Sequence, residues 1–234
     1  MLKQEDYTHH ISGQFNAELD ALRNFMLEMG GKVEQQLASA IAALVAMDSG
    51  QAELIINRDH EVNQMEMSID EQCATILARR QPAASDLRLI VAIIKVNTDL
   101  ERIGDEAAKV ALQAMRLSEA GHSPSSFLGI RHIGTCVAEM LRRALDAFAR
   151  LDAEAAVDVV RSDRVVDQEY GNALRSLMTF MMEDPRAIGS IINEMWALRS
   201  LERIGDHASN IAEHVIYLVR GMDVRHGRLE ELRE

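Results

Sequence analysis

Two copies of a short acidic motif are the residues of this chain best suited to chemistry. The hexapeptide Leu-Glu-Arg-Ile-Gly-Asp occurs twice in the 234 residues. Each copy holds a Glu and an Asp four positions apart: Glu101 with Asp105, and Glu202 with Asp206. On a helix these side chains lie one turn apart on one face, where two acids repel each other by about 0.2–0.5 kcal/mol. The glycine of each copy costs about 1 kcal/mol more in a helix interior. A pattern that weakens both helices indicates that this face has a use.

Further oxygen-bearing side chains lie on the neighbouring predicted helices. They are Asp163 and Asp167, their counterparts Asp59 and Asn63, the pair Glu66 and Asp70, and Asn210, one turn beyond Asp206. If the helices of one unit lie side by side, four such side chains converge. An oxygen-only ligand set suits Mg, Ca, Mn or Fe rather than structural zinc.

An ordinary solvated surface is the alternative interpretation of these acids. The helical period points both acids of each motif away from the hydrophobic seam of its helix. Glu101 can also pair with Arg102 or Lys109, which is worth under about 1 kcal/mol. The residues alone leave both interpretations open.

Two single residues near the second motif receive their own predictions. We expect His207 to be a solvated surface histidine, with contact to a metal as the alternative. We expect Trp196, the only tryptophan, to be buried in the core, with an interface as the alternative.

The elements that must position the acids come from a duplicated unit of roughly 100 residues. The hexapeptides are 101 positions apart, and upstream Gly30 aligns with Gly134 and Asp59 with Asp163 at an offset of 104. Apolar periodicity and turn residues predict three helices in each unit, over about 11–47, 51–80, 85–119, 127–150, 153–182 and 187–220. The third and sixth carry the heptad spacing of long helices packed in a bundle.

The predicted fold is therefore all-α. It consists of a three-helix bundle over 1–120, a linker at 121–126, a second three-helix bundle over 127–220 and a polar tail at 221–234.

Composition excludes several classes of protein. There are 25 basic and 37 acidic residues, a formal net charge of −12, which argues against binding to nucleic acid or directly to anionic lipid. No apolar run reaches the roughly 18 residues of a membrane helix, and the first ten residues lack the apolar stretch of a signal peptide. With two cysteines and no metal-ligand spacing between them, a cytoplasmic location is the simplest expectation.

At these residues the sequence resembles the PhoU family. The likeness rests on segments spread over nearly the whole chain: 14–19, 29–31, 33–34, Asp59 with 62–63, 86–88, and both hexapeptides, the second continuing to Glu213. The resemblance implies two pseudo-repeated three-helix bundles with spectrin-repeat-like packing. It implies a non-enzymatic adaptor that restrains phosphate uptake and negatively regulates the phosphate regulon. Its expected partners are the ATPase of the phosphate ABC transporter and the sensor histidine kinase PhoR, and a homodimer is its expected assembly.

The resemblance also implies that E(D)xxxD motifs bind a divalent metal ion or a multinuclear metal cluster. The expected metal is iron, manganese, magnesium or zinc. The motifs carry over as Glu101/Asp105, Glu202/Asp206 and Asp163/Asp167. The second helix departs from the pattern, because Asn63 replaces an acid, and Lys109 stands where the second unit has Asn210. We therefore predict that the first site is the weaker one.

A di-metal carboxylate enzyme is the alternative function. That chemistry usually takes Glu-x-x-His pairs that point into a bundle core. The only such pair, Glu119 and His122, straddles the predicted linker. We therefore expect no catalytic residues, and access to the membrane through protein partners alone.

Overall fold

Six long α-helices make up most of the computed structural model, which describes residues 13–120 and 127–224. They are α1 (Gly13–Ala46), α2 (Ser49–Arg80), α3 (Ala84–Ala120), α4 (Phe127–Arg150), α5 (Ala153–Glu183) and α6 (Ile188–Arg220), with a 3-10 turn η2 (Pro185–Ala187) before α6. The predicted all-α class is confirmed, and the helices begin and end close to their predicted positions. The predicted linker, 121–126, and residues 1–12 and 225–234 lie outside the described residues. Val224, in the predicted polar tail, is buried.

The short turns between the first two helices of each half are built alike. Asp48 caps α2 and Asp152 caps α5, each accepting hydrogen bonds from backbone N–H groups of the first turn. The preceding residues, Met47 and Leu151, have left-handed φ values of 52° and 54°. Because a cap and a left-handed residue together reverse the chain within two or three positions, each pair of helices folds back as a hairpin.

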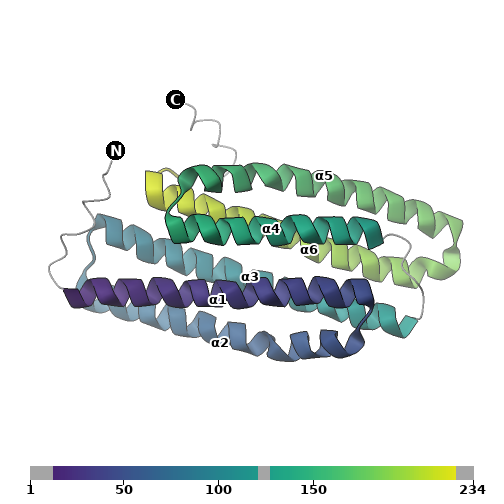
Figure 1. Cartoon of the computed structure of the whole chain (residues 1–234), viewed down its shortest axis with the longest axis horizontal. Coiled ribbons are helices and arrows are strands. Elements are labelled where there is room, and N and C mark those ends of the chain that lie inside the picture. Colours follow the sequence, from purple (N-terminus) through teal and green to yellow (C-terminus); the bar gives the residue numbers. More distant parts are fainter. Residues whose placement is uncertain (1–12, 121–126, 225–234) are drawn as a thin grey trace.

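The two predicted bundles are α1–α3 and α4–α6, and they share one continuous core. Figure 1 shows α2 and α5 at the two opposite edges, α1 and α4 side by side between them, and α3 and α6 passing behind α1 and α4. The motif residues Leu100, Ile103, Leu201 and Ile204 are fully buried in this core. None of the helices over 13–120 and 127–224 holds an apolar stretch long enough to cross a membrane.

Equivalent glycines bring α1 and α4 together. A Cβ at Gly30 would stand 2.8 Å from Leu145 Cδ2, and one at Gly134 would stand 3.0 Å from Ile41 Cγ2. The two contacts exchange their helices, so the halves are related by an approximate two-fold axis. Each glycine therefore makes room for a large side chain of the opposite half.

Buried acids connect α3 to α6. Asp99 is 8% exposed and is surrounded by His207 Nδ1 at 2.8 Å, Asn210 Nδ2 at 3.2 Å and His214 Nε2 at 3.2 Å. Burial raises the pKa of Asp99, but the hydrogen bonds from His207, His214 and Asn210 lower it more, so the carboxylate stays ionised. The prediction of a solvated surface His207 is wrong, because α3 covers that side of α6.

A second buried acid of α3, Glu106, also contributes to the contact between α3 and α6. It is 2% exposed and lies 2.6 Å from Arg203 of α6 and 3.0 Å from Lys109 of its own helix. The repeat places Glu106 at the position of His207. The two halves are thus held together by an ion pair at Glu106 and by a hydrogen bond from His207, two different side chains at one repeat position.

We predict that Gly30→Val destabilises the protein by about 1–3 kcal/mol, because the added methyl groups overlap Leu145 at the α1–α4 contact. Gly31→Val is the matched control, since a Cβ at Gly31 meets nothing within 4 Å. It should change stability by less than about 0.5 kcal/mol. Urea unfolding followed by circular dichroism measures both, and equal losses would show that the contact is not close packed.

Candidate metal centre

Carboxylates of the second half converge between α5 and α6. The two helices form a hairpin closed by η2 and run antiparallel side by side (Figure 1). Oxygen atoms of Asp167, Glu202 and Asp206 all lie within 4.8 Å of one another. Over residues 13–120 and 127–224, this is the one group of three or more His, Cys, Asp or Glu side chains that meet so closely.

A glycine of the second motif sets how closely α5 approaches. A Cβ at Gly205 would stand 3.3 Å from Val166 Cγ1 and 3.7 Å from Asp163 Oδ1. Asp163 therefore lies directly against α6, one turn from Asp167. A larger residue at Gly205 would push away the helix that carries both acids, so this glycine positions the site and does not merely weaken the helix.

The cluster is electrostatically strained. Burial and the charges of Asp206, Asp167 and Glu202 raise the pKa of Asp163 to about 6. Burial and Asp206 raise the pKa of Glu202, and burial and Asp167 raise that of Asp206. Arg199 offsets part of this charge, with Nη1 at 2.7 Å from both Glu202 oxygens. The site holds more negative charge than its side chains neutralise.

The expectation that both motif acids point away from the core needs correction at Glu202. This side chain is only 9% exposed, whereas Asp206 is exposed. The periodicity of α6 places Glu202 off the hydrophobic seam, but α5 covers that side. The periodicity of one helix does not show which neighbouring helix will cover a residue.

The structure does not bring Asn210 into the cluster. Its amide nitrogen donates to Asp99 across the α3–α6 contact. His207 is also turned to Asp99, so its Nδ1 is not directed at the carboxylates beside it in the sequence. Oxygen atoms of acids alone therefore make up the converging set.

The first half repeats the backbone arrangement but not the charge. A Cβ at Gly104 would stand 3.3 Å from Val62 Cγ1 and 3.5 Å from Asp59 Oδ1, as at Gly205. Asn63 takes the place of Asp167, and its buried side-chain oxygen has no hydrogen-bond partner within the described residues. One carboxylate of the second site is thus an amide in the first.

The acids of the first motif are also partly neutralised. Arg102 Nε lies 3.4 Å from a Glu101 oxygen, and Arg102 Nη1 lies 4.0 Å from an Asp105 oxygen. Burial and Asp105 raise the pKa of Glu101, while burial and Asp70 raise that of Glu66. The structure places Glu66 close enough to Asp105 for their charges to interact.

Sequence reasoning missed Gln36, which belongs to the first site. Its amide nitrogen donates to Asp59 Oδ1 at 2.7 Å and lies 3.4 Å from the carbonyl oxygen of Gly104. The equivalent residue of the second half is Met140. The sequence could have indicated Gln36, because the repeat has an amide at this position in the first half and an apolar side chain, Met140, in the second.

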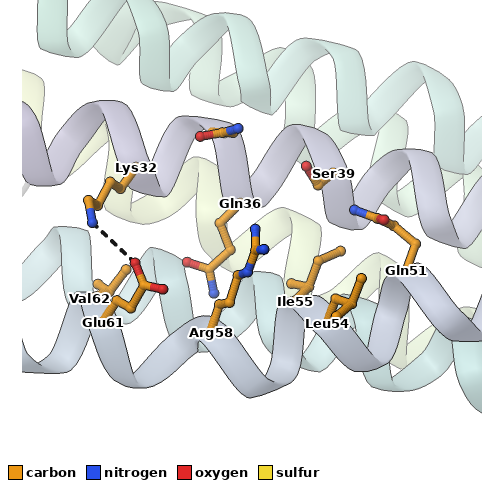
Figure 2. Close-up of a pocket in the computed structure, with 10 residues that line it drawn as sticks. Lys32, Gln36, Ser39, Gln51, Leu54, Ile55, Arg58, Glu61 and Val62 are labelled. Carbon is orange, nitrogen blue, oxygen red and sulfur yellow. Dashed lines mark hydrogen bonds and ion pairs between the residues drawn. The ribbon is translucent and has the colours of Figure 1, made fainter.

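Beside Gln36 lies an open groove of about 300 Å³ between α1 and α2. Figure 2 shows Gln36 and Arg58 reaching into it from opposite helices, and Lys32 paired with Glu61 at 3.1 Å. The second half has Met140 and Ser162 at the positions of Gln36 and Arg58. The polar lining of this groove is thus specific to the first half.

The converging carboxylates fit a metal ion better in the second half than in the first. Hard cations take carboxylate oxygens as ligands, and the like charges of Asp163, Asp167, Glu202 and Asp206 repel one another when no cation offsets them. The first half lacks one of these four acids, and Arg102 lies beside two of the remaining three, Glu101 and Asp105.

Comparison with known proteins identifies the origin of this arrangement. The family model described as the PhoU domain matches residues 26–114 and again 130–215. The chain belongs to the PhoU family. The two matches cover the two halves of the repeat, so each bundle is one PhoU domain.

Curated PhoU proteins match over nearly the whole chain. The phosphate-specific transport system accessory protein PhoU homolog of Pseudomonas aeruginosa is 58% identical, over 100% of this chain and 97% of that protein. The phosphate-specific transport system accessory protein PhoU of Escherichia coli is 48% identical, over 95% and 92%.

Solved PhoU structures confirm the fold. The crystal structure of PhoU from Pseudomonas aeruginosa matches with a TM-score of 0.87 and 60% identity, over 89% of this PhoU chain and 100% of that one. PhoU from Streptococcus pneumoniae, described as a phosphate transport system regulatory protein, matches with a TM-score of 0.83 and 32% identity, over 90% and 99%.

Asp163→Asn should stabilise the metal-free protein by about 1–2 kcal/mol at pH 7.5, because it removes a charge that the site holds at a cost. The folded state binds the Asp163 proton more tightly than the unfolded state, whose pKa is near 3.8. Stability from this group therefore falls as pH rises from about 4 to about 6 and stays low above that range. The benefit of the substitution should accordingly shrink below pH 6.

Thermal unfolding in the presence of a chelator, between pH 4.5 and 7.5, measures this effect. Asp158→Asn, which changes an exposed acid of the same helix, is the control. A stabilisation by Asp163→Asn that is equal at both pH values would contradict the assignment of strain to this carboxylate.

Proposed function

We propose that this PhoU protein is the non-enzymatic regulator of a phosphate-specific transport system. It restrains phosphate uptake and represses the phosphate regulon when phosphate is plentiful. It does so in the cytoplasm, by linking the ATPase of the phosphate ABC transporter to the sensor histidine kinase PhoR. The observation that carries the proposal is the match of both halves to the PhoU domain, together with relatives named as accessory proteins of that transport system.

The geometry of the acids supports an adaptor over a di-metal enzyme. Di-metal enzymes of helical bundles place Glu and His ligands inside the core. Here Asp167 and Asp206 are exposed, and His207 is held by Asp99. The acids therefore belong to a surface between two helices, where a bound ion affects what that surface presents.

We propose that the second half is the main metal site, with Asp163, Asp167, Glu202 and Asp206 as its ligands. The all-oxygen set favours iron, manganese or magnesium over zinc. A bound cation would supply the positive charge that these four carboxylates lack and would hold α5 against α6. The support is the convergence of three of the acids within 4.8 Å and the raised pKa of the fourth.

The first half is the weaker site in this proposal. Asn63 offers a neutral oxygen where Asp167 offers a charged one, and Arg102 competes for Glu101 and Asp105. Gln36 already donates to Asp59. The homodimer implied by the family resemblance stays a prediction.

Metal titration of paired variants tests the difference between the halves. Glu202→Gln should weaken binding of Mn²⁺ by about tenfold or more, because it removes one charged ligand from the strong site. Glu101→Gln changes the equivalent residue and should leave that strong site within about threefold. Calorimetry and elemental analysis of the folded variants give affinity and stoichiometry, and equal losses in the two variants would count against the asymmetry.

Regulation in cells tests the function itself. Deleting the gene should raise alkaline phosphatase activity in a medium rich in phosphate, and the intact chain supplied from a plasmid should restore repression. Repression that is unchanged in the deletion strain would refute the regulatory role. A purified protein that turns over an oxidisable substrate when loaded with iron would favour the enzyme instead.

A further inference from the structure

Five large apolar side chains are exposed where α5 turns into α6. They are Met178 (50% exposed), Met182 (76%), Ile188 (38%), Ile192 (42%) and Trp196 (59%), and we call them the hairpin patch. The prediction that Trp196 lies in the core is wrong. Monomeric surfaces rarely gather side chains of this size over a few hundred Å² unless the area is used for binding.

The hairpin patch is continuous because its residues on α5 lie opposite its residues on α6 along the antiparallel hairpin. Asp163 lies against Gly205, and the hairpin closes at η2, so Met182 is level with Ile188 and Met178 with Ile192. Trp196 follows one turn later on α6. Successive levels are about 6 Å apart at 1.5 Å rise per residue, which is within contact range of such side chains.

The patch shares a face with the carboxylate cluster. Met178 is eleven residues after Asp167, which places it about 20° from that acid around α5 at 100° per residue. Ile188 is eighteen residues before Asp206, which returns it to the same direction on α6. The apolar surface is thus the continuation of the acidic one toward the end of the hairpin.

The first half does not repeat this surface at the equivalent positions. The residues at the equivalent positions are Ala74, Ala78, Leu87, Val91 and Lys95. Lys95, the counterpart of Trp196, lies over the ring of Tyr217, with Nζ at 5.7 Å from its centre. Both halves fold as the same bundle with these different residues, so packing of the bundle does not require the exposed apolar side chains of the second half.

Arginines form the rim of the patch. Arg175, Arg186 and Arg199 each stand within three residues of a patch side chain and are exposed, in a chain whose formal net charge is −12. Arg175 donates only to the neutral amide of Asn172 among its recorded bonds, and Arg186, which pairs with Asp184 at 3.1 Å, still keeps 89% of its side chain exposed. Trp, Met and Arg are the residues enriched at protein interfaces, and arginines around an apolar centre favour carboxylates on the partner.

We propose that the hairpin patch is the docking surface for an amphipathic helix of another protein, whose apolar face is flanked by Asp and Glu. The surface of two adjacent helices accepts a third helix, and the anchors would be Trp196 and Met182. A second copy of this chain fits less well, because two identical patches would bring the arginine rims together and join two chains of charge −12. The identity of the partner as a transporter or kinase component rests on the proposed function, whereas the surface and its chemistry do not.

The single tryptophan of the chain gives a direct readout at the patch. Replacing it with 5-fluorotryptophan gives one fluorine NMR signal, free of any signal from a partner. The probes are the purified transporter ATPase and the purified full-length sensor kinase, each added to the labelled full chain. We expect one of them to shift the signal and to protect the label from a paramagnetic quencher in solution.

Variants define the chemistry of the contact. Met182→Asp and Ile192→Asp should each weaken binding by about 30-fold, because each places a charge in the apolar centre of the contact. Met67→Asp, which changes a methionine of α2 exposed by 62%, should change it by less than threefold. Arg175→Glu should weaken binding more than Arg161→Glu, which changes an exposed arginine of the same helix outside the rim.

Three outcomes would overturn the proposal. Binding of a probe with an unchanged fluorine signal would place the docking surface elsewhere and leave the regulatory function intact. A signal that shifts only with the concentration of this chain would make a second copy the occupant. Binding of neither probe would overturn the surface, while the alkaline phosphatase assay would still decide the regulatory function separately.

Discussion

The antiparallel packing of α3 against α6 is the contact on which the rest of the structure depends. Asp99 and Glu106 are buried there as acids, and the partners that satisfy them stand mainly on the opposite half. An acid that loses such partners keeps the cost of leaving water, which is typically 3–5 kcal/mol, on the order of a domain's whole stability. Sliding one half along the other would leave Asp99 unpaired and would leave Glu106 with Lys109 of its own helix alone. The two PhoU domains therefore have one relative register, and every surface feature is placed by it.

Duplication gave both halves the same backbone contact and then different charges. In each half a motif glycine lies against a valine and an aspartate of the preceding helix: Gly104 with Val62 and Asp59, and Gly205 with Val166 and Asp163. The remaining side chains decide what the contact does. An amide, a glutamine and an arginine reduce the charge in the first half. In the second half Arg199 pairs with Glu202, but the other carboxylates are left to repel one another, and the end of the same hairpin is apolar. The fold therefore rests on what the repeats share, and both proposed binding surfaces rest on the side chains in which they differ.

The sequence predicted those parts of the structure that one helix determines by itself. Turn residues and apolar periodicity located all six described helices, because a cap or a heptad seam acts within a single element. The motif pairs were placed on shared faces for the same reason. The sequence did not predict the environments of three residues of α6, because those environments depend on which helix packs beside it. The three residues are Trp196, His207 and Asn210. Glu202 shows the limit most clearly, because the period of its own helix directs it outward and α5 then covers it.

Arg199 belongs to both features of the α5–α6 hairpin. Its guanidinium lies 2.7 Å from both oxygens of Glu202, and it stands on the rim of the hairpin patch one turn from Met195 and Trp196. An arginine satisfies one carboxylate fully or two partially, because its donors form a fixed planar fork. An acidic partner at the proposed docking surface would therefore compete with Glu202 for the same group. In these proposals a cation that satisfied Glu202 would leave Arg199 to the partner, and one side chain would couple the two surfaces without any change of fold.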